Sequence, residues 1–291
     1  MEKGYSFLRE PSLSDMDDFK ENPFLYGIPV LFPPNRLEDG RFSFMNRIYQ
    51  FPINEPETHN HLHGFFYDRK WEVSDLQADE NQSSIELVMT VNEQADIYHY
   101  FPHVFKVYLR YTLSSAGLRQ SVKVVNEGET VMPVMLGFHT TFKAPFAKNS
   151  HETDVMLQLS ITGRVQLNDR SLPTGKVLPL DQNEQQLAGE GNSPYFQPLG
   201  HHYLADKGGT NRMVLTDKRE KVSLIYETGS KFPFWMLYNK DANSGFFCPE
   251  PQTIMVNAPN VKLPAEQTVI IGLKKGEIWS AESRLYTEKL L

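Results

Sequence analysis

Short segments in which apolar and polar residues alternate recur along the chain, and they constrain its fold more than any other feature. From Val104 to Leu113 every second residue is apolar or aromatic, and 118–125 shows a similar pattern after the turn sequence Ser114-Ser115-Ala116-Gly117. Alternation of period two predicts strands with one buried face, so these two segments are expected to form a hairpin. Further strands are expected at 85–91, 131–138, 155–159, 222–226, 234–238 and 268–273.

Helical signals are few. A short helix is expected at 12–21, where Ser12 or Ser14 can cap a first turn that contains acidic residues. A polar helical turn is expected at 183–188, inside the most polar stretch, 181–192, which is interpreted as a surface loop. Because no βαβ alternation, internal repeat or linker divides the sequence, residues 1–291 are assigned to one all-β domain, a large antiparallel sandwich.

Charge and cysteine content exclude several classes of partner. The formal net charge is −7 and no run of Lys and Arg interrupts it, which argues against nucleic acid and anionic membranes as partners. No apolar stretch reaches the ~18 residues of a membrane span, and the first ten residues lack a signal-peptide pattern. Cys248 is the only cysteine, so no intrachain disulfide is possible. A cytoplasmic protein is expected.

Two segments in the first third of the chain carry candidate binding residues. The apolar run 27–34 ends in two prolines and then presents Asn35 and Arg36; the arginine has donors suited to sugar hydroxyls or a carboxylate, although a solvated loop arginine fits equally. Further on, the sequence His59-Asn60-His61-Leu62-His63 would place three histidines on one face of an extended strand. A metal site would need further ligands nearby, so we expect hydrogen-bonding roles and no metal.

Two later segments carry candidate acid–base groups. His139 interrupts the apolar segment 134–142, where it is either a core histidine with a backbone partner or an acid or base active at neutral pH. Glu250 lies between Pro249 and Pro251, after two phenylalanines. The prolines restrict its backbone, and apolar surroundings would raise the pKa of its carboxyl group, as suits a general base. The alternative is a surface turn with an incidental acid.

Taken together, these segments resemble the aldose 1-epimerase (galactose mutarotase-like) family from about residue 27 to residue 273. The resemblance rests on motifs that occur in the family's order, namely Ile28-Pro29-Val30-Leu31-Phe32-Pro33-Pro34-Asn35-Arg36, Ile48-Tyr49-Gln50-Phe51-Pro52, Asn60-His61-Leu62-His63-Gly64, His139-Thr140-Thr141-Phe142, Glu250-Pro251-Gln252 and Asn257-Ala258-Pro259-Asn260. Each motif alone is weak, but their common order and similar separations make a specific pattern.

The resemblance implies a β-supersandwich fold and an isomerase that interconverts the α and β anomers of a free aldose without metal or organic cofactor. It implies that Glu250 is the base at the anomeric hydroxyl, that His139 is the acid at the ring oxygen, and that His63 assists close to that oxygen. It also implies that Arg36, with Asn35 and Gln252 from the matched motifs, contacts the sugar. No nucleotide-binding fingerprint or phosphate loop is present, which agrees with a reaction that has no redox step.

The sequence departs from the family where many relatives carry an Asp-His pair that binds sugar hydroxyls. The corresponding stretch here is 199–206, and its Asp is absent from the expected place, so Asp206, His201 or His202 would have to substitute. The identity of the sugar therefore stays open, as does a monomeric or homodimeric state. Three other functions remain possible: a glycoside hydrolase or lyase, a non-catalytic sugar-binding protein on the same fold, and a hexose-phosphate mutarotase.

Overall fold

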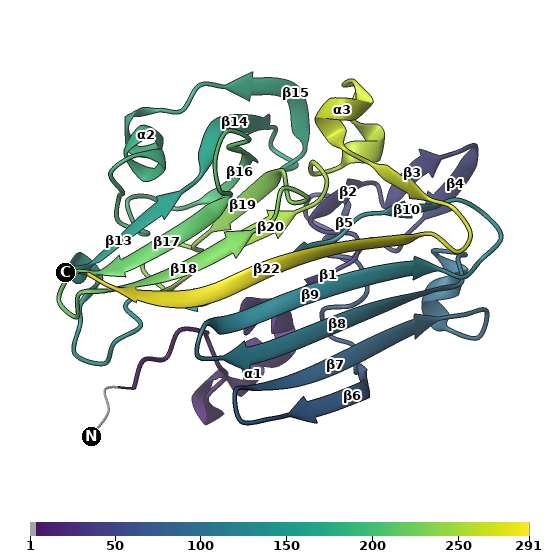
Figure 1. Cartoon of the computed structure of the whole chain (residues 1–291). Helices are drawn as coiled ribbons and strands as arrows, with labels where there is room; N and C mark the ends of the chain where they lie inside the picture. Colours follow the sequence, from purple (N-terminus) through teal and green to yellow (C-terminus); the bar gives the residue numbers. More distant parts are fainter. Residues whose placement is uncertain (1–3, 291) are drawn as a thin grey trace.

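The computed structural model describes residues 4–290, which form two large antiparallel sheets packed as a sandwich (Figure 1). The first sheet has eight strands, because the short strand β12 (Phe142–Lys143) pairs with β20 beside the main path. The order along that path is β1 (Val30–Leu31), β11 (Gly137–Phe138), β20 (Phe246–Gln252), β19 (Phe234–Tyr238), β16 (Gly200–Ala205), β14 (Ile161–Leu167) and β15 (Pro173–Leu178).

The second sheet also has eight strands, and its long strand β22 joins the two halves of the sheet, as Figure 1 shows. The order is β13 (Val155–Leu159), β17 (Arg212–Asp217), β18 (Val222–Thr228), β22 (Ile278–Lys289), β9 (Gly117–Asn126), β8 (Phe105–Ser114), β7 (Gln82–Val91) and β6 (Glu72–Ala78). β8 and β9 pair in register from end to end, so the hairpin expected from the alternating pattern is confirmed.

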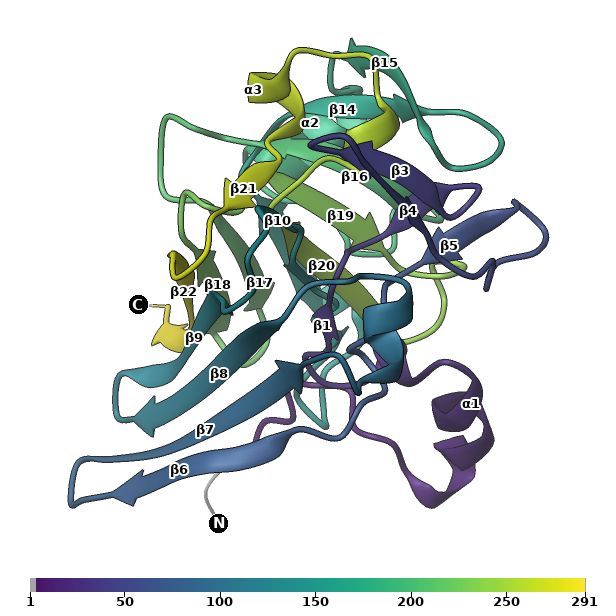
Figure 2. The same cartoon turned by 90° about the vertical axis from the view of Figure 1, so that its right-hand side faces the viewer.

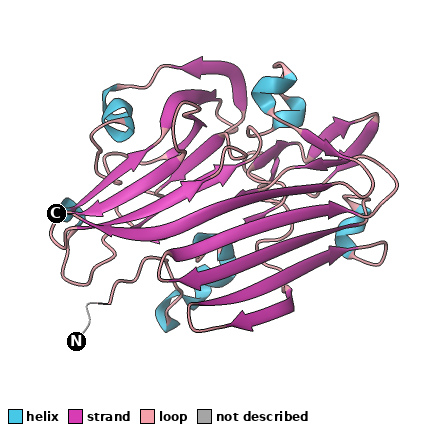
Figure 3. Cartoon of the chain, viewed as in Figure 1, coloured by secondary structure: helices cyan, strands magenta, loops and turns pink. Residues whose placement is uncertain are grey.

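Three two-stranded ribbons lie beside the large sheets, and Figure 2 labels β3 and β4, β10 and β21, and the strand β5 of the third ribbon. They are β2 (Arg36–Glu38) with β5 (Asn60–Leu62), β3 (Arg41–Phe44) with β4 (Arg47–Gln50), and β10 (Met132–Val134) with β21 (Ile271–Leu273). Helices are short, as Figure 3 makes plain. The α-helices are α1 (Met16–Glu21), α2 (Gln182–Ala188) and α3 (Ala265–Thr268), and the 3₁₀ turns are Leu13–Asp15, Pro23–Leu25, Asp96–His99, Glu152–Asp154 and Ala258–Asn260.

The all-β expectation is confirmed, and the differences have local causes. The strand expected at 131–138 is divided between β10 and β11, which belong to different sheets, and the one expected at 268–273 begins only at Ile271. The helical turn expected at 183–188 is confirmed as α2, capped by Asp181, whose side chain accepts the backbone N–H of Glu184. The interpretation of 181–192 as a surface loop is wrong for this helix, because one side of it packs into the protein. Glu184 and Leu187 of this helix are fully buried, so an amphipathic turn anchors the stretch.

Two large buried clusters distinguish the two faces of the first sheet. One cluster lies between the first sheet and strands β13, β17 and β18, and it contains Trp235 and Leu237 of β19. Because neighbouring side chains of a strand point to opposite faces, Met236 points the other way, together with Glu250, its partner on β20. The other cluster lies under β7, β8 and β9 and the N-terminal strands. Within the described residues, no helix has the length and apolar character needed to span a membrane.

Candidate functional site

Glu250 and His139 form a buried contact on the face of the first sheet that points away from Trp235. Oε1 of Glu250 lies 3.1 Å from Nε2 of His139, and the two side chains are only 2% and 3% exposed. His139 follows directly after β11, and its backbone N–H donates to the carbonyl oxygen of Pro29. Gln252, two residues along β20, donates from Nε2 to Oε2 of Glu250 at 3.4 Å. A carboxyl group and an imidazole are thus held within hydrogen-bonding distance inside the protein.

The prolines on either side of Glu250 lie where β20 lacks a partner on one edge. β20 pairs with β19 at five consecutive positions, but in the described residues its other edge pairs only near its ends, with β11 and with β12. Pro249 and Pro251 fall in the unpaired stretch between, where their missing N–H groups break no ladder hydrogen bond. Residues 139–141 connect β11 to β12 past this gap. The interrupted pairing therefore lets His139 approach the strand that carries Glu250.

His63 reaches the same site through a tight turn after β5. Its backbone has φ 64°, and that of Gly64 has φ 68°, so two successive residues are left-handed. The backbone N–H of His63 donates to the carbonyl oxygen of Asn35 at 2.9 Å. Position 64 requires glycine, because an added Cβ would lie 2.1 Å from the carbonyl oxygen of Phe32. The turn leaves the ring of His63 with its centroid 5.1 Å from that of His139.

Arg36 is oriented by a carboxylate. Nε of Arg36 donates to the two oxygens of Glu55 at 3.1 and 2.9 Å, and Nη2 donates at 2.6 Å. Burial acts to raise the pKa of the Glu55 carboxyl group, but hydrogen bonds from Arg36 and Thr58 outweigh it and keep that pKa below its usual value. Asn35, also buried, accepts the backbone N–H of Arg36 with its own side-chain oxygen, so Oδ1 of Asn35 is engaged within the turn.

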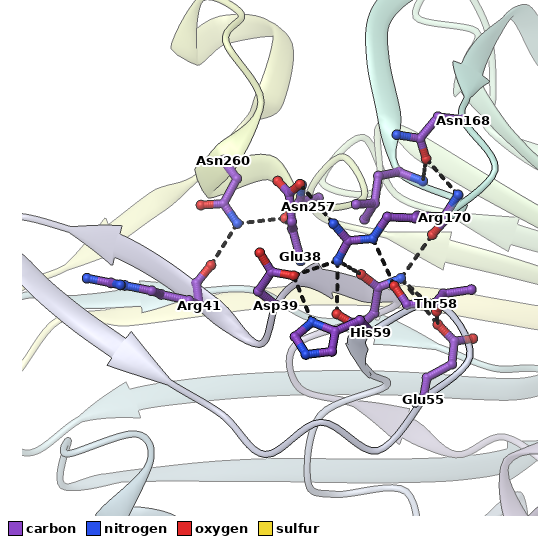
Figure 4. A network of polar contacts seen from close by, with 12 residues as sticks. Glu38, Asp39, Arg41, Glu55, Thr58, His59, Asn168, Arg170, Asn257 and Asn260 are labelled. Atoms are coloured by element: carbon purple, nitrogen blue, oxygen red, sulfur yellow. Dashed lines mark hydrogen bonds and ion pairs between the residues drawn. The ribbon is translucent and has the colours of Figure 1, made fainter.

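A polar network around Arg170 fixes the loop that leads into β5 (Figure 4). Arg170 comes from the connection between β14 and β15, and it donates to the carbonyl oxygens of Thr58 at 2.8 Å and His59 at 2.9 Å. It also forms an ion pair of 2.7 Å with Asp39, which in turn contacts Nδ1 of His59. The first sheet thereby holds the ribbon of β2 and β5, which carries Arg36 at its start.

The motif Asn257-Ala258-Pro259-Asn260 clamps the backbone of the same ribbon. The N–H of Asn257 donates to the carbonyl oxygen of Arg36, and its Oδ1 accepts the N–H of Glu38, both at 3.0 Å. Asn260 donates to the carbonyl oxygen of Arg41 at 2.8 Å, as Figure 4 shows. This motif therefore positions Arg36 through its main chain.

Burial dominates the electrostatics of the site. It raises the pKa of the Glu250 carboxyl group well above its usual value, opposed by the positive charge of Arg36 and the hydrogen bond from Gln252. Burial lowers the pKa of His139 to about 3. It also lowers the pKa of His63 far below 6.5, assisted by the charges of His139 and Arg36. Both histidines therefore favour the neutral form, and Glu250 favours the carboxylic acid, when no ligand is bound.

The structure does not bring His201 and Asp206 together with the residues above. His201 lies on the opposite face of β16 from His202, where its Nδ1 is 3.1 Å from the hydroxyl of Tyr203 and 3.5 Å from the carboxylate of Glu184. Asp206 follows the end of β16, where its carboxylate accepts the N–H of Gly208 within a turn.

His202 instead shares the face of Glu250. In the strand pairing His202 lies opposite Met236, and Met236 lies opposite Glu250, so the three side chains form a row across β16, β19 and β20. The ring of His202 is fully buried, stacks on Phe234, and accepts the backbone N–H of Val256 at its Nε2. The alternation of a strand separates His201 from His202, but which of the two faces the site depends on the register with β19.

The three alternating histidines of 59–63 do not share one face. His59 is exposed and bonds to Asp39, whereas the buried His61 has its Nδ1 2.7 Å from the carbonyl oxygen of Pro52. The expectation of one common face fails because His59 and His63 both have left-handed backbones, and only the residues between them are extended. Across residues 4–290, no group of three His, Cys, Asp or Glu side chains is arranged to hold a metal ion.

Two aromatic residues at the site have no signal in the sequence. The ring centroid of Phe24 lies 4.9 Å from that of His63 and 5.3 Å from that of His139. Tyr67 meets Phe24 edge to face at 5.7 Å. Phe24 belongs to the N-terminal segment, more than a hundred residues before His139, so only the fold brings these rings together.

A large antiparallel sandwich with a buried carboxyl–imidazole pair and further histidines is an arrangement suited to acid–base chemistry on a small polar molecule. The model of the aldose 1-epimerase family matches residues 9–286. This chain therefore belongs to the aldose 1-epimerase family, and it has the galactose mutarotase-like sandwich fold.

Solved structures agree with this assignment. A galactose mutarotase-like protein from Clostridium acetobutylicum superposes with a TM-score of 0.94 at 33% identity, over 99% of this chain and 87% of that one. Galactose 1-epimerase from Lactobacillus acidophilus superposes with a TM-score of 0.71 at 18% identity, over 98% and 86% of the two chains, which shows a shared fold. The Escherichia coli protein YphB, described as uncharacterized, is 25% identical over 90% of this chain and 83% of its own length.

Proposed function

We propose that this protein is an aldose 1-epimerase that interconverts the α and β anomers of a free aldose. The observation that carries the proposal is the buried contact of 3.1 Å between Nε2 of His139 and Oε1 of Glu250. Anomer exchange requires that one oxygen lose a proton while another gains one, and both oxygens are bonded to the same carbon. A carboxyl group and an imidazole that touch one another can serve two such neighbouring oxygens at once.

In the proposed reaction Glu250, as the carboxylate, removes the proton from the anomeric hydroxyl, and His139, as the imidazolium, gives a proton to the ring oxygen. The bond between the anomeric carbon and the ring oxygen breaks, and the sugar opens to the free aldehyde. After rotation about the C1–C2 bond, the same groups act in reverse, and the ring closes as the other anomer. Protons and electrons balance over the cycle, so no cofactor is needed.

The proton content of the pair supports this assignment. A carboxylic acid beside a neutral imidazole, the form favoured by burial, contains the same single proton as a carboxylate beside an imidazolium. The reaction needs the carboxylate beside the imidazolium, and the shift of one proton from Glu250 to His139 across their contact produces this state. The positive charge of Arg36 acts to lower the pKa of Glu250 and therefore favours the carboxylate. Hydrogen bonds from a bound sugar would favour it further.

Unsatisfied polar atoms support a polar ligand at the same place. Buried side-chain nitrogen and oxygen atoms normally have hydrogen-bond partners, yet Nδ1 of His63, Nδ1 of His139 and Oε1 of Gln252 have none among the described residues. A sugar, with hydroxyls that both donate and accept, could engage several such atoms together. Arg36 would add Nη1, because Glu55 occupies Nε and Nη2. We propose that Arg36, Gln252 and His63 contact the sugar.

An uncharged sugar fits these charges better than a sugar phosphate. Arg36 is the cation whose charge acts on both His63 and Glu250, and its charge is matched by the carboxylate of Glu55. A phosphate placed here would compete with Glu55 for the same guanidinium. We therefore propose a neutral aldose as substrate, with glucose 6-phosphate as the comparison.

Polarimetry on freshly dissolved α-glucose, α-galactose and a panel of other aldoses tests the proposal. The protein should speed the approach to the same final rotation for at least one free sugar, and Glu250→Gln, which keeps the shape of the side chain, should lose nearly all of this acceleration while remaining folded. No acceleration by the folded wild type on any free or phosphorylated aldose would overturn the proposal. Acceleration with glucose 6-phosphate alone would identify a hexose-phosphate mutarotase, and release of reducing sugar from a glycoside would identify a hydrolase.

A further inference from the structure

The N-terminal strap, defined here as residues 9–27, is fastened at both ends to the connection of residues 139–141, which carries His139. The backbone N–H of Arg9 donates to the carbonyl oxygen of Thr141, and the N–H of Thr141 donates to the carbonyl oxygen of Gly27, both at 3.0 Å. The N–H of Gly27 in turn donates to the carbonyl oxygen of Arg9. Because Thr141 is two residues beyond His139, the strap is tied to the candidate site through main-chain hydrogen bonds.

Side chains lock the strap in one position. The guanidinium of Arg9 stacks on the ring of Tyr26 at 4.0 Å and on that of Phe246 at 4.3 Å, and Nη2 of Arg9 forms an ion pair of 2.9 Å with Asp18. The hydroxyl of Tyr26 donates to the same carboxylate at 2.6 Å. Leu25 and Tyr26 are each 5% exposed. Phe24, the residue before this buried pair, is therefore presented by a fixed backbone.

The ring of Phe24 lies beside the two site histidines. It contacts both His63 and His139, and it is only half-buried. Its ring offers apolar surface and no hydrogen-bond donor, whereas the imidazoles and Glu250 offer polar atoms. A pyranose ring has the matching distribution, with C–H groups on its faces and hydroxyls around its rim. A sugar stacked on Phe24 would therefore turn its hydroxylated rim toward the polar groups.

We propose that Phe24 is a specificity-determining residue, the apolar wall on which the sugar ring stacks, and that the N-terminal strap serves to deliver it. This inference rests on the proposed function and names the substrate class: aldopyranoses whose C–H groups gather on one face. Sugars with a hydroxyl projecting from that face would lose the contact, because the hydroxyl would be buried against the ring without a partner.

Kinetics of Phe24→Ala and Phe24→Leu test the wall. Loss of the ring should raise KM about tenfold or more while kcat changes less than about threefold, since the contact is made equally in the ground state and in the transition state. Phe24→Leu should restore part of the affinity. Phe19→Ala is the matched control, because Phe19 packs on Tyr26 within the same strap at 5.2 Å and should leave KM unchanged. An equal rise in KM for Phe19→Ala would show that only strap stability matters, and unchanged or improved KM for Phe24→Ala would also overturn the proposal.

Saturation-transfer NMR with the best aldose separates this inference from the proposed function. Magnetisation should pass from the wild-type protein to the C–H protons of one face of the sugar, and this transfer should fall in Phe24→Ala. Binding of this kind without accelerated anomer exchange would overturn the proposed function and leave the wall in place. Accelerated anomer exchange by the wild type, with undiminished magnetisation transfer in Phe24→Ala, would refute only the stacking role of Phe24. The absence of both binding and acceleration in the wild type would refute the stacking role and the proposed function together.

Discussion

The pH dependence of anomer exchange offers a quantitative test of the His139–Glu250 pair. The active protein must contain one proton on the pair, because a pair with two protons lacks a base and a pair with none lacks an acid. Burial lowers the pKa of His139 to about 3 and raises that of Glu250 well above its usual value. The one-proton state therefore extends from acidic pH to beyond the usual range of a carboxyl group.

The size of the expected change in kcat/KM depends on the pH below which the pair takes up a second proton. Because the Glu250 carboxyl group already holds one proton near neutrality, a histidine with the ordinary pKa of 6.5 would add the second proton near that pH, and kcat/KM would fall about 100-fold between neutrality and roughly pH 4.5. With a pKa of about 3 for His139, the pair still contains a single proton there. We therefore expect kcat/KM to change less than about twofold over the same interval.

The assay is polarimetry at low sugar concentration between about pH 4.5 and pH 9, with the spontaneous rate subtracted at each pH and the folded state checked by circular dichroism. The value of kcat/KM reports the ionisations of the free protein, to which the burial argument applies. A fall of tenfold per pH unit that begins near pH 6.5, in a protein that stays folded, would show that His139 is solvated like an exposed histidine. The lowered pKa of His139, and the burial argument behind it, would then be refuted.

His139→Asn should lower kcat by ~10²-fold or more, the usual contribution of one acid–base group, and a loss below tenfold would contradict its role as the acid. Activity measured after treatment with EDTA should equal that of the untreated protein, whereas inactivation that added metal reverses would revive a metal role for His61 and His63. The free energy of unfolding should fall on mild acidification. Burial lowers the pKa of His61 and His103 to about 4 and that of His139 and His202 to about 3. These histidines therefore bind protons near pH 6.5 in the unfolded chain but stay neutral in the folded protein. Each histidine contributes about 1.4 kcal/mol per pH unit to this loss below pH 6.5, opposed by Glu250, and equal melting temperatures at about pH 7 and pH 5.5 would contradict it.

Strands with alternating or continuous apolar residues could be predicted from the sequence, including β18 and β19, whereas the proline-containing β20 could not. β13 alternates in burial along its length, β8 does so in its first half and β9 in its second half, and all three lie where the pattern places them. β20 is buried at every position and contains two prolines, so it has neither alternation nor the usual composition of a strand. The sequence predicts β10 and β11 as one strand, and it begins β21 too early. Apolar runs do not show where the chain passes from one sheet to another.

The residues of the candidate site could be nominated from local chemistry, but their contacts required the fold. Glu250 was distinguished by its prolines, and His139 by an apolar segment, while nothing in either segment indicates that the two side chains touch. Glu55, which engages Nε and Nη2 of Arg36, lies in an ordinary polar loop. Phe24 lies in a short 3₁₀ turn, and nothing in the sequence of that turn distinguishes it from an ordinary apolar residue of the core. Residues that orient or cover a site are therefore harder to find than residues that carry charge.

The gap in the first sheet explains why the prolines beside Glu250 and the histidine after β11 occur together. A continuous ladder between β11 and β20 would engage the edge of β20 with backbone hydrogen bonds and would keep the connection of residues 139–141 from passing close to it. Pro249 and Pro251 cannot donate such bonds, so they keep this edge open where the side chain of Glu250 meets that of His139 from the neighbouring connection. Their missing N–H groups, as much as their rigidity, account for the position of Glu250 beside His139.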